Sequence, residues 1–194
     1  MRARILGMLA VIACVAMLAP RAAATSVGTS AIDALCAARD ERARASDPVV
    51  VARVYGGRDT TGRWRLADAA LLARVARDPD LYSDVARVYR VDGSVAIARI
   101  RTRSLDYYAD AEYCYRASGT LARERDTSSG TVNRDDEARY LDEAGRVVAQ
   151  SSKLSPLSPT PGASVSPDVR ASIPDLYRTV RALPFFEVVE AARR

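Results

Sequence analysis

The sequence predicts an α+β fold, in which an N-terminal helix packs on an antiparallel β-meander of about six strands and a short helix lies near the C-terminus. Two patterns carry this prediction. Three pairs of β-rich runs between residues 84 and 152 are each joined at a glycine turn, and apolar residues recur at helical spacing near both ends of the mature chain. The 194 residues suffice for one ordinary domain. The expected organisation is a leader (1–24), an α+β domain (25–154), a linker (155–168) and a C-terminal docking segment (169–194).

The first element is a predicted secretory signal peptide over residues 1–24. Arg2 and Arg4 precede 15 apolar residues, 5–19, and the small residues 22–24 then form a cleavage site. That apolar run is shorter than the roughly 20 residues of a transmembrane helix. We therefore expect a secreted or periplasmic protein with no stable membrane span after cleavage.

Two other fates of the leader stay open. An uncleaved leader would anchor the chain in a membrane. Residues 11–14 (VIAC) also resemble a lipobox, which would leave the protein lipid-anchored through Cys14. The hydrophobic stretch continues past Cys14 to Ala19, whereas a lipoprotein usually turns polar there, so we favour cleavage before Thr25.

Composition excludes several classes of function. The chain contains no histidine, which removes histidine-based catalytic triads and histidine-ligated metal sites. Loss of the leader removes three arginines and no acidic residue, so the net charge falls from +5 to +2. Such a chain lacks the strongly basic face that nucleic acids require. We predict no nucleic-acid partner, no metal and no cofactor.

The first helix is expected within residues 25–46, with Ser30 as its N-cap. Cys36 shares an apolar face with Ile32 at i, i+4 spacing, so it should point toward the core. Cys36 and Cys114 are the two cysteines of the mature chain. An even count in an exported protein favours one disulfide between them.

The next elements are a strand and a helix. Residues 49–55 are rich in β-branched side chains and predict a short strand. A broad apolar stripe predicts a helix over about 67–77, ending before Pro79. Trp64, between these elements, is expected to anchor the core.

Residues 84–152 give the strongest signal, three successive hairpins. Their turn glycines, at 93, 119 and 145, recur every 26 residues, which suits either an internal repeat or a regular meander. Six strands without crossovers form an antiparallel sheet. The strands are expected at residues 85–89, 95–100, 111–115, 121–123, 137–141 and 147–149.

Charge pairing predicts the register of the second and third strands. With Arg99 opposite Glu112 and Arg101 opposite Asp110, opposite charges pair on one face. A slip of one residue would bury charge among alanines.

This register separates two faces of the sheet. Cys114 joins the charged face, whereas Tyr113 and Tyr115 lie on the apolar face that should form the core. The charged face offers a candidate binding surface made of Arg99, Arg101 and Arg103.

The Ser/Thr/Pro-rich residues 155–168 predict a linker or an extended strap. After it, Pro174 should open a short helix that Pro184 ends. Phe185 and Phe186 follow in an apolar tail that should dock on the domain or on a partner, so they form a second candidate binding surface. The expected helical face consists of Ile173, Leu176, Tyr177, Val180 and Leu183.

Residues 113–123 (YCYRASGTLAR) resemble the tyrosine-then-Gly-x-Leu hairpins of exported bacterial proteins of unknown function, and are similar to MORN-variant repeats. The resemblance covers roughly residues 84–152. It implies a hairpin sheet and no catalytic residues.

Two functions stay open at this point. We favour a non-catalytic binding or structural module that contacts a protein or polymer of the cell envelope. The alternative is a histidine-free hydrolase of an envelope polymer, which needs two carboxyls about 5–10 Å apart. Nearby arginines and a polar loop favour structural roles for the available acids. These acids are Asp106, Asp110, Glu112, Asp135, Asp136 and Glu137.

Overall fold

A computed structural model of the chain describes residues 25–55, 62–78, 81–104, 107–131, 133–157 and 176–193, with the side chains of 25–27 excepted. The expected leader, most of the expected linker, and the positions Asp106, Ile173 and Pro174 lie outside these residues.

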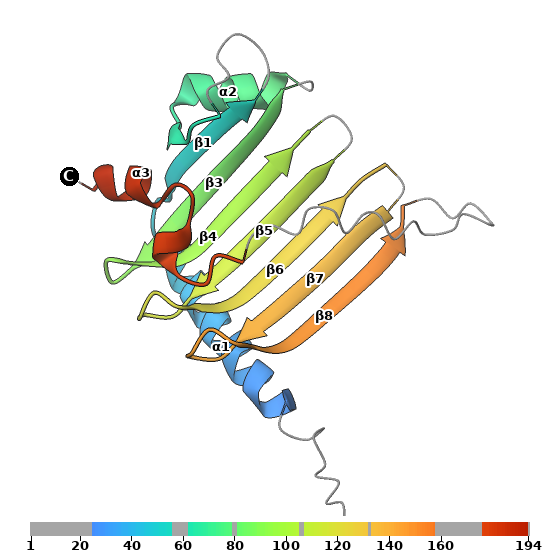
Figure 1. Cartoon of the computed structure of the whole chain (residues 1–194). Helices are drawn as coiled ribbons and strands as arrows, with labels where there is room; N and C mark the ends of the chain where they lie inside the picture. Colours follow the sequence, from blue (N-terminus) through green and yellow to red (C-terminus); the bar gives the residue numbers. More distant parts are fainter. Residues whose placement is uncertain are drawn as a thin grey trace, which may run out of the picture.

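One antiparallel sheet of eight strands organises the described part of the chain (Figure 1). The strand order is β2-β1-β3-β4-β5-β6-β7-β8, so six consecutive strands form a meander. The sequence predicted this α+β architecture and the meander, but about six strands instead of eight. The strands are β1 (Val49–Tyr55), β2 (Arg65–Leu66), β3 (Tyr82–Val91), β4 (Ser94–Arg103), β5 (Tyr108–Tyr115), β6 (Leu121–Ser129), β7 (Asn133–Leu141) and β8 (Val147–Pro156).

The two additional strands lie at the β3 side of the meander. Strand β1, which the sequence predicted as a short strand, pairs antiparallel with β3 along its whole length. The two-residue strand β2 pairs with β1. Helix α2 (Ala69–Arg77) follows β2, with Asp68 as its N-cap accepting from the backbone of Leu71 at 2.7 Å.

Glycines end the strands of the meander where the backbone needs positive φ. Gly93, Gly119 and Gly145 have φ of 74°, 83° and 75°. Asp92 precedes Gly93 with φ of 52°, and two successive positive values are the signature of a type I′ hairpin. The predicted turns are therefore confirmed.

The predicted register is also confirmed. Arg99 lies opposite Glu112 and Arg101 opposite Asp110 between β4 and β5. Tyr113 is fully buried, as expected for the apolar face.

The sheet has two differently covered faces. Helix α1 (Thr25–Ala43) lies behind the sheet in Figure 1, and residues 176–193 lie in front of it. We call these the helix face and the C-terminal face. On the helix face, Cys36 of α1 packs on Ile97 and Cys114. On the C-terminal face, buried apolar side chains of β1, β3, β4, β5 and β6 pack against the last residues of the chain.

A disulfide between Cys36 and Cys114 joins α1 to β5, as predicted, with an S–S distance of 2.05 Å and Cα atoms 5.8 Å apart. Ion pairs from α1 to the sheet add to it, such as Arg123–Asp33 at 2.6 Å. The predicted N-cap was wrong, because α1 already begins at Thr25 and Ser30 lies inside the helix.

The C-terminal segment differs from its prediction. The backbone of residues 178–180 is held against the β5–β6 hairpin, since Leu121 donates to the carbonyl of Arg178 and Val180 donates to that of Gly119, both at 2.9 Å. Within the described residues 176–183, where part of a helix was expected, these bonds leave one 3₁₀ turn, η2 (Val180–Ala182). The α-helix of this segment, α3 (Phe186–Ala191), lies after Pro184 instead of before it.

Phe185, expected as a candidate binding surface, is 1% exposed in the main core. Phe186 is half-buried against the same core. The tail therefore docks on its own domain, which removes Phe185 from any surface. The expected linker also begins later than residue 155, because β8 continues to Pro156.

Candidate ligand pocket

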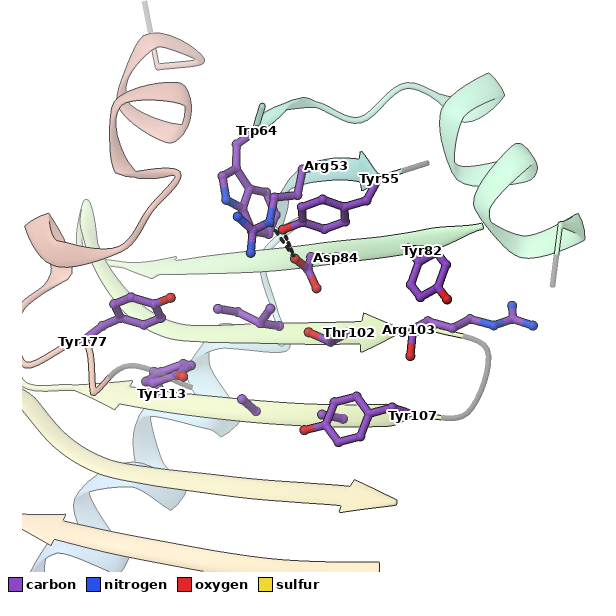
Figure 2. A pocket seen from close by; sticks show the side chains of 14 residues that line it. Arg53, Tyr55, Trp64, Tyr82, Asp84, Thr102, Arg103, Tyr107, Tyr113 and Tyr177 are labelled. Carbon is purple, nitrogen blue, oxygen red and sulfur yellow. Dashed lines mark hydrogen bonds and ion pairs between the residues drawn. The ribbon is translucent and has the colours of Figure 1, made fainter. Parts of the chain in front are cut away.

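A pocket of about 430 Å³ opens on the C-terminal face, over β1, β3, β4 and β5 (Figure 2). Its volume falls in the range of roughly 300–1,000 Å³ typical of small-molecule sites. Its walls carry six aromatic side chains: Tyr55, Trp64, Tyr82, Tyr107, Tyr113 and Tyr177.

Strand pairing explains why the pocket forms here. Asp84 of β3 lies opposite Arg53 of β1 and opposite Thr102 of β4, so these side chains form one row across the face. Ala109 and Ala111 continue the lining on β5. Because their side chains are single methyl groups, they leave space between the aromatic walls.

A polar group is built into the β1 side of the pocket. Asp84, 4% exposed, accepts hydrogen bonds from Arg53 Nε at 2.6 Å and from the Tyr55 hydroxyl at 2.9 Å (Figure 2). The guanidinium carbon of Arg53 lies 4.8 Å from the ring centroid of Tyr55 and 4.9 Å from that of Trp64. Burial, reinforced by Asp84, raises the pKa of Tyr55, which therefore keeps its proton at neutral pH.

Two aromatic pairs connect the pocket to the C-terminal segment. The rings of Trp64 and Phe185 meet edge to face with centroids 4.7 Å apart, and those of Tyr113 and Tyr177 lie 5.3 Å apart. The buried indole nitrogen of Trp64 has no hydrogen-bond partner in the described part of the chain. A buried donor of this kind normally finds a partner, so this N–H is an unsatisfied donor in a side chain of the pocket wall.

The pocket borders two buried acids that sequence reasoning missed. Glu124 and Asp126 of β6 lie opposite Tyr113 and Ala111, and they are 2% and 7% exposed. Burial raises the pKa of Glu124 to about 7, although Arg139 at 2.9 Å opposes this effect. Burial, with nearby carboxylates, raises the pKa of Asp126 to about 6. If the predicted strand pairing had been continued from β5 to β6, Glu124 and Asp126 would have been expected on the same face as Tyr113.

The acids proposed from sequence as a catalytic pair do not meet in the pocket. Asp110 and Glu112 lie on the helix face, each 3.0 Å from an arginine of β4. Asp136 accepts from Arg134 and from the Thr127 hydroxyl at 2.9 Å.

The other two acids lie on the same face as the pocket but outside its lining. Glu137 accepts from Arg139 at 3.1 Å, and Asp135 accepts from the Ser152 hydroxyl at 3.3 Å. Asp84 is the one carboxylate among the described residues that line the pocket.

The arginines of the candidate binding surface are distributed differently from the prediction. Arg99 bridges Asp40 of α1 and Glu112, at 2.6 and 3.0 Å, so its charge is already matched. Arg101 is paired with Asp110. Arg103 lies at the pocket rim, and its guanidinium points away from the pocket in Figure 2.

Among the described helices, none combines the length and hydropathy that crossing a bilayer demands. The described residues contain no group of three metal-ligating side chains. No protein-family model matches the chain, and comparison with curated proteins and with solved structures found no match either. The resemblance to MORN-variant repeats therefore stays a prediction.

Proposed function

We propose that the mature chain is an exported, non-catalytic binding module that uses the aromatic pocket to hold a component of the cell envelope or extracellular space. The observation that carries this proposal is the pocket itself, which combines six aromatic side chains with the prebuilt Arg53–Asp84–Tyr55 group on its β1 side. Pockets that combine apolar walls with a few fixed polar groups are typical ligand sites. The leader pattern and the Cys36–Cys114 disulfide support export.

The pocket favours binding over hydrolysis. Glycosidic hydrolysis of the usual kind needs two carboxyls on either side of the bond that breaks. Asp84 is already engaged by Arg53 and Tyr55, and no second carboxylate lines the pocket in the described part of the chain. Glu124 has a raised pKa suited to an acid, but it is buried against Arg139 and lies outside the lining.

Trp64 makes the proposal directly testable, because it is the only tryptophan of the chain and it lines the pocket. Envelope fractions of the native host, titrated into the mature protein, should change Trp64 fluorescence saturably. The variant Tyr82→Ala removes an exposed pocket ring and should weaken the binding that causes this change. Tyr89→Ala is the matched control, since Tyr89 contacts Arg99 on the helix face and lines no part of the pocket. Unchanged emission with every fraction, or equal responses of both variants, would refute the proposal.

Export has a separate test. Protein purified from the native host should begin at Thr25. Recovery of the native protein with its leader intact would contradict export with cleavage, whatever the pocket binds.

A further inference from the structure

The pocket also indicates the chemical class of its ligand. Resting on the proposed function, we infer that the pocket holds uncharged sugar rings of a glycan chain. Four features of the described residues carry this inference: matched charge, exposed ring faces, hydroxyl-rich walls and an open end.

Matched charge disfavours ionic ligands. The cation of Arg53 is 2.6 Å from the buried carboxylate of Asp84, so the β1 wall adds no net charge. The other charged residue of the lining, Arg103, points away from the pocket (Figure 2). A phosphate or carboxylate ligand would need an unmatched cation, and an ammonium ligand would need an unmatched anion.

The aromatic walls suit a ring with an apolar face. Tyr113 and Tyr177 lie together at one end of the pocket, and Tyr82 and Tyr107 lie at the other (Figure 2). Tyr82 is 40% exposed and Tyr107 is half-buried, so both leave ring surface in water. A sugar ring presents C–H groups on its faces and hydroxyls at its edge. It can therefore cover an aromatic ring while its hydroxyls still meet polar groups or solvent.

Polar atoms are spaced along the same walls. The unpartnered N–H of Trp64 is a donor, and the hydroxyls of Tyr82, Tyr107, Thr102 and Ser104 are donors or acceptors. Sugar hydroxyls donate and accept, so they match such a mixed set. A lipid chain would leave these groups unsatisfied, because it has no polar atoms along its length.

The pocket continues into a second depression, so the two together are longer than one sugar ring. A second depression of about 380 Å³ shares Arg103, Ser104 and Tyr107 with the pocket, and extends to Tyr108 and Gly130 along the ends of the strands. A chain of linked rings can occupy both hollows, whereas an isolated sugar would fill only one. A glycan chain is therefore a better occupant than a free monosaccharide.

The test is a panel of probes, measured by Trp64 fluorescence and by calorimetry with the mature protein. The panel contains neutral oligosaccharides of increasing length (cello-, malto- and chito-oligomers), oligogalacturonate as the anionic probe, choline as the cationic probe and a fatty acid. We expect at least one neutral series to bind with affinity that rises with length and then levels off. Tyr82→Ala should weaken that binding about tenfold. Tyr82→Phe, which keeps the ring, should lose less, and Tyr89→Ala, on the helix face, should bind like the wild type.

The outcomes separate the ligand class from the proposed function. Binding of choline, oligogalacturonate or the fatty acid, with no response to any neutral oligosaccharide, overturns the sugar inference and leaves the pocket as a binding site. No response to any probe, while an envelope fraction still changes Trp64 emission, likewise overturns only the inference. No response to probes or fractions overturns both. Equal binding by Tyr82→Ala and Tyr89→Ala would place any bound sugar outside this pocket, and would also count against the inference.

Discussion

Replacing Glu124 by glutamine should stabilise the protein above neutral pH. The Glu124 side chain is 2% exposed, and burial raises its pKa to about 7 despite the ion pair with Arg139. A carboxyl with a raised pKa binds its proton more tightly in the folded state than in the unfolded state. The stabilisation is therefore full below the unfolded pKa near 4.5 and is lost as pH rises through about 7.

The expected gain in stability follows from the shift in the pKa of Glu124. Raising the pKa from 4.5 to about 7 corresponds to roughly 3 kcal/mol between the two protonation states. Glutamine mimics the protonated acid and does not ionise. Glu124→Gln should thus lie within about 1 kcal/mol of the wild type near about pH 5, and should exceed its free energy of unfolding by up to roughly 3 kcal/mol near about pH 8. Asp126, with a pKa of about 6, titrates together with Glu124, so the wild-type curve reports the pair.

Urea unfolding, followed by Trp64 fluorescence, measures the free energy of unfolding of the wild type and of Glu124→Gln at the two pH values. Asp136→Asn is the matched control, because arginine and hydroxyl partners lower the pKa of Asp136 and its titration falls below the tested range. The free energy of unfolding of Asp136→Asn should change between the two pH values by the same amount as that of the wild type. A wild-type stability that rises between about pH 5 and about pH 8, or a Glu124→Gln variant less stable at the higher pH, would refute the reasoning.

The remaining predictions concern the framework around the pocket. Replacing Cys36 and Cys114 by serine should lower the free energy of unfolding by about 4–5 kcal/mol, because the cross-link closes a loop with a sequence separation of 78; equal urea midpoints with and without the disulfide would contradict this. Gly119→Ala, at φ of 83°, should cost about 1–2 kcal/mol in thermal unfolding. The same change at Gly28, inside α1 with open space around it, should cost nothing or stabilise, so a similar loss at both would be inconsistent with backbone strain. Phe185→Ala should cost about 3–5 kcal/mol in urea unfolding, whereas a cost below about 1 kcal/mol would indicate a surface side chain.

The meander could be predicted from sequence because the residues that specify each hairpin lie close together in the chain. Turn glycines mark where each hairpin reverses, and positive φ at Gly93 and Gly145 is a requirement that few other residues meet. The register of β4 and β5 was also predictable, since Arg99 and Arg101 each had one acid within reach across the turn. The disulfide followed from an even cysteine count.

The pocket and the C-terminal segment were not predictable, because they depend on contacts between distant residues. The apolar spacing of residues 176–183 suited a helix, but backbone hydrogen bonds to Gly119 and Leu121 hold that segment in an extended form. Trp64 was correctly expected to pack on the core, yet its place beside Arg53 required the pairing of β1 with β3. Glu124 and Asp126 lie beyond the strand predicted at residues 121–123, and only the sheet register reveals their burial.

The pocket is assembled from parts of the chain that are synthesised at different times. Arg53, Tyr55 and Trp64 come early and the strands of the floor follow, but the wall at Tyr177 and the support that Phe185 gives to Trp64 come from the last 18 described residues. Both cysteines are synthesised well before that segment, so oxidation can lock the scaffold while one side of the cavity is still missing. A chain clipped after residue 157 would lose the Tyr177 wall and the apolar side chains that cover the C-terminal face, and with them the pocket. Ligand binding would thus report that residues 176–193 have been synthesised and have docked on the sheet.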